Sequence, residues 1–281
     1  MEELQELSLR ESQLATLEIV KKIDSICKKE GIKYWVNYGS LIGAIRHKGF
    51  IPWDDDFDIG MSRPDYTKFL QYCYSHKQEL YPFEIHNIHT HEFCWYNISR
   101  FCDNRYVCKF DKWRGYDESG LFVDIYPYDG QGERKDNRYW FRTDKNRCWY
   151  MMMARLSSAK KFEKSKTLKK TLVRMFMYPF AKLHKPSFYL RKMEKIASKY
   201  SWDESEYAFC TAWTAYRKMH FYKKEYFEDL IEVDFENIKV PVPRKYDEFL
   251  TEFYGDYMKL PPKEEQNPQH FYKTYRKGNI K

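Results

Sequence analysis

The feature that most constrains this chain is an acidic segment, "DDDFD" (54–58), placed among apolar residues. Four carboxylates within five positions repel one another, so they are either solvated or neutralised by a cation. The overlapping segment "DFDIGM" (56–61) alternates acidic and apolar residues, and this period of two is typical of a β-strand with one core face. Because residues i and i+2 of a strand point to the same face, Asp56 and Asp58 are expected to project together.

A third acid, Asp124, interrupts the apolar segment "GLFVDIYPYD" (120–129), which also predicts a strand. A lone carboxylate inside such a strand is costly unless it has a partner. If the two strands are neighbours, the acids converge, and each like-charge pair costs about 4 kcal/mol at ~4 Å and an effective dielectric constant of ~20. A divalent cation would remove that penalty, and oxygen-only ligands favour Mg²⁺ or Mn²⁺ over zinc. The predicted metal ligands are Asp56, Asp58 and Asp124, with Asp54 as a further candidate.

A Gly-Ser turn precedes the acidic segment. Gly39 and Ser40 follow the predicted strand "IKYWVNY" (32–38), and Ser40 lies near the start of a predicted short helix, "SLIGAIRHK" (40–48). Such a turn presents backbone N–H groups and a hydroxyl to an anion. Together with the acids, it predicts a phosphate site beside a metal. The alternative, a solvated acidic loop, is disfavoured because Asp58 and Asp124 lie within apolar alternation.

This combination resembles the nucleotidyltransferase fold of the polymerase-β type, although the fifteen residues between Ser40 and Asp56 are a long spacer for that superfamily. The spacer itself is informative. The motif "GSLIGAIRHKGFIPWDDDFDIGM", the strand "GLFVDIYPYD" and the tail "FENIKVPVPRKYDEFLTEFYGDYMKLPP" resemble the LicD family of phosphotransferases, relatives of fukutin. Family members usually have Gly-Thr where this chain has Gly39-Ser40, and the hydroxyl is kept.

The resemblance implies transfer of a substituted phosphate from a CDP-linked donor to a sugar hydroxyl, with release of CMP. Bacterial members move phosphocholine from CDP-choline onto teichoic acid or lipopolysaccharide glycans, and relatives move ribitol- or glycerol-phosphate; the acceptor is often lipid-linked. On this basis Asp56, Asp58 and Asp124 are the expected catalytic residues, holding Mg²⁺ against the donor diphosphate. Asp124 could also accept the proton of the attacking hydroxyl.

Two other functions fit parts of the sequence. A true nucleotidyltransferase would need the same acids but would use CTP or ATP. A non-catalytic nucleic-acid binder would leave the three acids unexplained, so no nucleic-acid partner is expected.

The residues around the acids are the expected substrate contacts. They are Gly39, Ser40, Arg46, Lys48, Trp53, Arg100, Tyr126 and Tyr128. Arg46 and Lys48 could neutralise phosphate or be ordinary surface cations, and Arg100 stands where the family usually has a lysine. The three aromatic residues could surround a choline headgroup through cation–π contacts or simply pack.

Periodicity divides the chain of 281 residues into three parts. Residues 1–132 are predicted to form an α/β (α+β) catalytic core like that of nucleotidyltransferases. Residues 133–205 form a helical, basic insertion, and residues 206–281 a C-terminal segment that packs back on the core. Helices are expected at 4–30 and 62–80, strands at 83–88, 93–101 and 105–110, and a strand, a proline turn and a helix within 237–262.

The formal charge of +8 is concentrated in one segment. Between Lys160 and Lys185 lie nine Lys or Arg residues and one acid, Glu163, a net charge equal to that of the whole chain. The apolar part of this segment, "LVRMFMYPFAKL" (172–183), is too short to span a bilayer but could lie on an anionic leaflet. The alternative is a solvated helix that packs Phe176 and Met177 into the core.

No signal peptide is recognisable at the N-terminus, and the seven cysteines include no CxxC pair. We therefore expect a cytoplasmic protein that contacts the inner face of the cell membrane peripherally.

Overall fold

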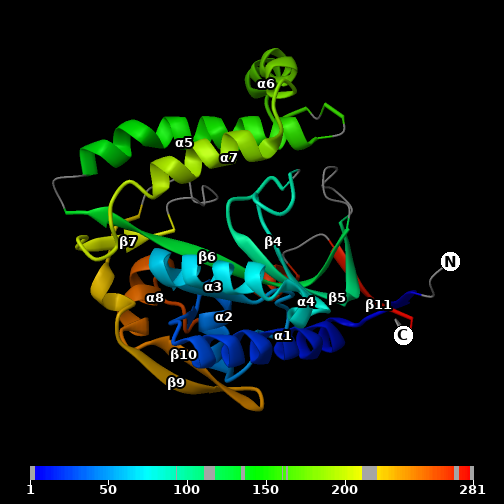
Figure 1. The fold of residues 1–281 in the computed structure, drawn as a ribbon, viewed down its shortest axis with the longest axis vertical. Coiled ribbons are helices and arrows are strands. Elements are labelled where there is room, and N and C mark those ends of the chain that lie inside the picture. The colour runs from blue at the N-terminus through cyan, green and yellow to red at the C-terminus, as the bar shows by residue number, and fades with distance from the viewer. Residues whose placement is uncertain are drawn as a thin grey trace.

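A mixed β-sheet lies at the centre of the protein, with helices on both sides (Figure 1). The computed structural model describes residues 4–92, 94–110, 118–133, 137–159, 161–162, 164–210, 220–268 and 272–278. Along the main path of the sheet the strands are β1 (Leu4–Glu6), β11 (Tyr272–Lys277), β5 (Ser99–Phe110), β6 (Glu118–Gly132), β3 (Asp58–Ser62) and β2 (Trp35–Val36). Three more strands complete it: β4 (Phe83–His86) pairs with β5, and β7 (Tyr207–Phe209) joins β6 to β8 (Tyr222–Lys223). The α/β class predicted from the sequence is confirmed.

Only one pairing among the described strands is parallel, that of β3 with β6. All the others, including β5 with β6, are antiparallel. The parallel pair matters for function because it connects the two strands that carry acids in apolar surroundings.

The N-terminal helices have clear sequence-encoded ends. Helix α1 (Leu9–Glu30) begins with a capping box between Ser8 and Glu11 and ends at Gly31, which adopts φ 60°. Helix α3 (Arg63–Ser75) is capped by Ser62, whose hydroxyl accepts the backbone N–H of Asp65. Both helices pack on the sheet, α1 on β5 and β6 and α3 on β3, β4 and β6. Between them lie α2 (Tyr38–Ile42) and the π-helical turn η1 (Gly43–His47), and α4 (Lys77–Leu80) follows α3.

The predicted helical insertion is present as α5 (Asn137–Ser158), α6 (Leu168–Ala181) and α7 (Pro186–Ala197). Helices α5 and α7 pack side by side as a layer above the sheet, and α6 is the outermost element, attached to α5 (Figure 1). None of the described helices is long and apolar enough to cross a membrane.

The C-terminal part returns to the centre of the molecule. After the short turn η3 (Lys224–Tyr226), β9 (Leu230–Phe235) and β10 (Ile238–Pro243) form a hairpin, and α8 (Tyr246–Tyr254) follows and ends at Gly255. The turn η4 (Lys263–Glu265) leads to β11, which lies between β1 and β5 in the main sheet. The tail therefore packs on the core, while the three-part division into domains stays a prediction.

Several predicted elements differ from the structure in extent. Residues 4–6 form a strand paired with β11 rather than the start of the first helix, because Ser8 caps that helix later. The strand expected at 32–38 is only Trp35–Val36. The strands expected at 93–101 and 105–110 are replaced by one strand, β5, which begins only at Ser99, and residue 93 lies outside the described residues. The strand expected at 56–61 begins at Asp58, so Asp56 lies in the preceding loop. The helix expected at 62–80 is interrupted at His76.

Candidate active site and metal centre

The parallel pairing of β3 and β6 brings the predicted acids together. Asp58 lies directly opposite Asp124 in the register of this pair, and Asp56 immediately precedes β3. Carboxylate oxygens of Asp56, Asp58 and Asp124 all lie within 4.8 Å of one another. The convergence predicted from the sequence is confirmed, although Asp56 reaches the site from a loop and not from the strand.

This cluster is buried and electrostatically strained. Asp58 and Asp124 are only 7% and 5% exposed. Burial raises the pKa of Asp58 well above its ordinary value, and the nearby carboxylates of Asp56, Asp124 and Asp54 raise it further. A hydrogen bond with Tyr126 acts in the opposite direction but is weaker. The cluster therefore carries excess negative charge that the protein does not neutralise fully.

The donor set fits a hard divalent cation. Oδ1 of Asp58 is buried and has no hydrogen-bond partner among the residues that the structure describes, which is unusual because buried polar atoms are nearly always paired. An all-carboxylate set of oxygens is what Mg²⁺ or Mn²⁺ binds. Asp54, Asp55 and Asp56 form a second, overlapping group with oxygens within 4.8 Å, so Asp54 remains a candidate ligand.

Arg100 faces this cluster from the other side of β6. It lies opposite Asp124 in the β5–β6 register, and its Nε donates to Oδ1 of Asp124 at 2.8 Å. The guanidinium carbon lies 3.8 Å from the ring centroid of Phe122 and 4.4 Å from that of Tyr96. The side chain is 12% exposed. Arg100 was predicted to contact substrate phosphate, but the structure has it orient Asp124 and stack on aromatic rings.

The predicted phosphate turn lies against the acidic loop. The hydroxyl of Ser40 accepts the backbone N–H of Asp58 at 2.9 Å, which ties α2 to the start of β3. A Cβ on Gly39 would come 3.1 Å from Oδ2 of Asp54. A side chain at position 39 would therefore crowd that carboxylate, and the glycine allows the close approach.

The predicted cationic contacts lie elsewhere. Nη1 of Arg46 donates to the backbone oxygens of Tyr257 and Lys259 at 2.7 and 3.2 Å, so its guanidinium anchors the segment after α8. Lys48 is exposed and caps η1 with φ 52°, and its charge acts on Asp234 of β9. Arg46 is therefore engaged by the C-terminal segment, and the exposed Lys48 fits the alternative of a surface cation, while contact of either with phosphate stays a prediction.

The three predicted aromatic contacts have different surroundings. Tyr128 is fully buried, its hydroxyl donates to Oδ1 of Asn37, and its ring packs against Trp35 at 5.0 Å between centroids. It is a core residue, so its predicted role in caging a substrate is wrong. Tyr126 is 7% exposed and contacts Asp58, so it positions an acid. Trp53 is half-buried and directly precedes Asp54 in the sequence.

Two residues that the sequence did not single out hold the acidic loop in place. Nε2 of Gln13, from α1, donates to the backbone oxygen of Asp54 at 2.8 Å. The hydroxyl of Tyr272, from β11, donates to the backbone oxygen of Asp55 at 2.6 Å. They are 41 and 217 residues from their partners, and no local pattern marks them.

Comparison with known proteins agrees with this geometry. The family model for the nucleotidyltransferase domain of LicD, FKTN and FKRP matches residues 31–155. The lipopolysaccharide cholinephosphotransferase LicD of Haemophilus influenzae is 32% identical over 278 residues, covering 97% of this chain and 99% of that protein. The chain belongs to the LicD family. It is therefore a LicD-type transferase, as its motifs predicted.

Other similar proteins match shorter segments of the chain. The ribitol 5-phosphate transferase FKRP of mouse and human is 39% identical over 51 residues, which are 18% of this chain and 10% of FKRP. An uncharacterized protein of Rickettsia typhi is 38% identical over 77 residues, 27% of this chain and 25% of that protein.

A second group of side chains in this LicD-family chain also resembles a metal site. Glu84, His86 and His91 offer ligand atoms within 4.8 Å of one another. His86 Nε2 and Glu84 Oε1 are hydrogen-bonded at 2.5 Å, and the two imidazole rings are 3.8 Å apart between centroids. Nδ1 of His91 lies 2.9 Å from the hydroxyl of Thr90. These mutual contacts explain the group without a metal.

Proposed function

We propose that this protein is a metal-dependent phosphotransferase that moves phosphocholine from CDP-choline onto a sugar hydroxyl of a cell-surface glycan, such as teichoic acid, lipopolysaccharide or capsule, and releases CMP. The observation that carries the proposal is the meeting of Asp56, Asp58 and Asp124 around an unpaired, buried carboxylate oxygen. Similarity to a lipopolysaccharide cholinephosphotransferase over nearly the full length of the chain supports choline as the carried alcohol.

In this proposal Asp56, Asp58 and Asp124 hold Mg²⁺, or Mn²⁺ in its place, and Asp54 is the candidate for a second ion. The metal supplies positive charge beside the donor diphosphate. Arg100 keeps one oxygen of Asp124 occupied at 2.8 Å and so leaves the other for a ligand. Tyr126 is hydrogen-bonded to Asp58 and positions that carboxylate in the same way.

The chemical step is an in-line displacement at phosphorus. The sugar hydroxyl oxygen forms a bond to the phosphorus of phosphocholine, and the bond to the bridging oxygen breaks, so that CMP leaves with the electron pair. Asp124 is the proposed acceptor of the hydroxyl proton. Backbone N–H groups around Gly39 and Ser40 are the proposed contacts of the donor phosphates. Trp53 is the proposed contact of the choline headgroup through a cation–π interaction.

CDP-ribitol is included in the test as a second donor because FKRP, a ribitol 5-phosphate transferase, matches part of the chain. Ribitol-phosphate has no cationic headgroup, so it would need hydrogen-bonding groups where choline needs an aromatic face. Transfer of glycerol-phosphate would make the same demand.

The test is a thermal-shift panel that needs no acceptor. The protein is melted with Mg²⁺ or with EDTA in the presence of CDP-choline, CDP-ethanolamine, CDP-glycerol, CDP-ribitol or CTP. A ligand at ~100 times its Kd stabilises the native state by about 2.7 kcal/mol, which corresponds to roughly 4–5 °C for a chain of this size. We expect a Mg²⁺-dependent shift with CDP-choline that is lost in Asp124→Asn and kept in the matched control Asp203→Asn, an exposed aspartate.

Each outcome decides between the candidates. A shift with CDP-ribitol or CDP-glycerol instead of CDP-choline would replace the donor and keep the phosphotransferase. A shift with CTP alone would favour a nucleotidyltransferase. An equal shift in EDTA would show that the donor binds without a divalent cation, and the proposed metal site would be wrong.

A further inference from the structure

We propose that the outward face of α6 docks the protein on an anionic lipid bilayer. The six apolar residues of this face, called here the α6 face, are Leu168, Leu172, Val173, Met175, Phe176 and Phe180. All six are exposed, from 48% for Phe180 to 76% for Leu168. The inference is independent of the donor and metal proposed above, because none of these residues belongs to the acidic site.

The residues of the α6 face form an apolar stripe along the helix, and this stripe faces solvent. At about 100° per residue, the six positions span roughly 160° of the helix circumference. The opposite side of α6 contacts α5, and there Ala181 is buried while Met177 and Tyr178 are partly buried against the core. An ordinary amphipathic helix buries its apolar stripe, whereas this one buries a narrower side and leaves the wide stripe uncovered. Of the two residues expected to pack in the core, Met177 does so in part, and Phe176 is 68% exposed.

Hydrogen bonds also fix both ends of α6, so the orientation of the apolar stripe is set by the rest of the protein. Lys182 Nζ donates to the backbone oxygens of Ser157 and Ala159 at 2.7 and 2.5 Å. The hydroxyl of Tyr189, in α7, donates to the backbone oxygen of Phe180 at 3.1 Å. The hydroxyl of Thr167 caps the N-terminus by accepting the N–H of Lys170.

The charge around the α6 face identifies the partner as anionic. The sequence from 164 to 193 contains nine Lys or Arg residues and no Asp or Glu. Four of these lysines, Lys164, Lys166, Lys169 and Lys170, are exposed on and just before the first turn of α6. Long lysine side chains can extend along an apolar surface and keep their ammonium groups at the level of lipid phosphates.

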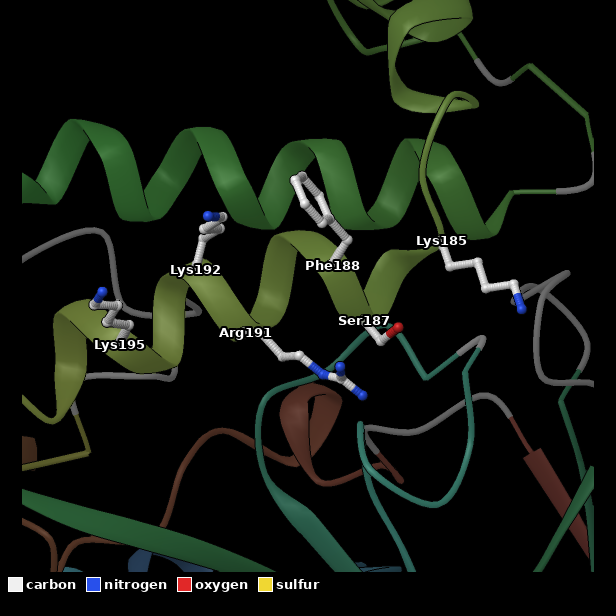
Figure 2. A pocket seen from close by; sticks show the side chains of 6 residues that line it. All are labelled: Lys185, Ser187, Phe188, Arg191, Lys192 and Lys195. Carbon is white, nitrogen blue, oxygen red and sulfur yellow. The ribbon is translucent and has the colours of Figure 1, made fainter.

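A cationic groove on the adjoining helix extends the same charge. It has a volume of about 500 Å³ and is lined by Lys185, Ser187, Phe188, Arg191, Lys192 and Lys195 (Figure 2). Lys185 pairs with Glu92. Among the described residues, neither Arg191 nor Lys195 has a carboxylate within ion-pair distance, and Figure 2 shows Arg191 pointing away from α6.

The position and length of α6 fit a bilayer surface better than a protein groove. It lies at one extreme end of the molecule, farthest from the β9–β10 hairpin (Figure 1). A protruding helix can meet a flat surface without obstruction from the rest of the protein. Its 14 residues span about 21 Å, less than the ~30 Å of a hydrocarbon core, so α6 would lie in the interface and not cross it.

The test is co-sedimentation of the full chain with vesicles. One set contains equal parts of phosphatidylcholine and phosphatidylglycerol, and the other contains phosphatidylcholine alone. We expect the chain to bind the anionic vesicles, and we expect this binding to weaken as the salt concentration rises. Binding to the neutral vesicles should be weaker by about tenfold or more. The Lys169→Glu/Lys170→Glu variant should bind the anionic vesicles at least about tenfold more weakly than the wild type, and Leu172→Ser/Phe176→Ser should also lose binding.

Matched controls separate the α6 face from surface chemistry in general. Lys33→Glu/Lys263→Glu makes the same charge change on exposed lysines far from α6 in sequence, and Met258→Ser/Leu260→Ser replaces two residues that are 53% and 52% exposed. Both controls should bind like the wild type, and all variants should keep the wild-type melting temperature. Equal loss in the controls, or unchanged binding in the α6 variants, would overturn the proposal. So would a dimer of the wild-type chain that the Leu172→Ser/Phe176→Ser variant abolishes without any effect on vesicle binding.

Discussion

Replacing Asp58 with asparagine should make the metal-free protein more stable, although it removes a residue of the site. Asp58 lies within 4.8 Å of Asp56 and Asp124. At that separation and an effective dielectric constant of ~20, each like-charge pair costs about 3.5 kcal/mol. Proton uptake relieves part of this repulsion, because the pKa of Asp58 is raised well above its ordinary value, and Arg100 offsets part of the charge of Asp124. We therefore expect Asp58→Asn to raise the free energy of unfolding of the metal-free protein by about 2 kcal/mol.

The assay is thermal unfolding in EDTA and in Mg²⁺. For a chain of 281 residues, 2 kcal/mol corresponds to a rise of roughly 3–4 °C in the melting temperature. In EDTA, Asp58→Asn should melt higher than the wild type by this amount, whereas Mg²⁺ should stabilise only the wild type. The control Asp203→Asn removes an exposed carboxylate and should behave as the wild type in both buffers.

The opposite pattern would refute the reasoning. If Asp58→Asn melts below the wild type in EDTA, the carboxylate is stabilised in the native state and the cluster is not strained. If the variant keeps the full Mg²⁺ shift, Asp58 is not a ligand.

Two further predictions concern a buried ion pair and a half-buried histidine. Arg100→Met should lower the free energy of unfolding by about 3 kcal/mol in urea titrations, because it leaves the buried Asp124 without its partner. The control Arg244→Met breaks an exposed ion pair and should change the free energy of unfolding by less than about 0.5 kcal/mol. Similar losses in both variants would contradict the role of Arg100 as the partner of Asp124. Burial and the charge of a neighbouring histidine lower the pKa of His91 from 6.5 to about 4. Between these pH values the native state binds fewer protons than the unfolded state. Stability is therefore lost as the pH falls from about 6.5 to about 4. His91→Gln should flatten that part of the stability curve; a slope that survives in this variant would assign the effect to other groups.

Local patterns in the sequence were sufficient to place the acids. The alternation of acidic and apolar residues around Asp58, and the single acid in 120–129, predicted two strands that carry carboxylates in apolar surroundings. The cost of an unpaired buried carboxylate indicated that Asp124 needs a partner, but its convergence with Asp58 depended on the two strands being neighbours, as the β3–β6 pairing shows. The start of α1 was predicted too early, at residue 4, although its cap, Ser8, depends on only a few adjacent residues.

The partners of those acids could not be predicted in the same way. Arg100 and Tyr126 were recognised as site residues, but their contacts with Asp124 and Asp58 depend on strand order and register. Arg46 is attached to a segment about 211 residues away, and no short-range signal encodes such a contact. Gln13 and Tyr272 were missed because their hydrogen bonds to the acidic loop come from elements at the two ends of the chain.

The sequence by itself determined which residues share a face, and the tertiary structure decided which faces are covered. Periodicity placed Tyr128 on the same side of its strand as Asp124, but only the packing of Trp35 and Phe227 on its ring made it a core residue. Periodicity also gave α6 an apolar stripe, yet the structure turns that stripe outward and buries the opposite side on α5. The physical reason is that periodicity follows from the local geometry of the backbone, whereas burial depends on segments that are distant in the chain.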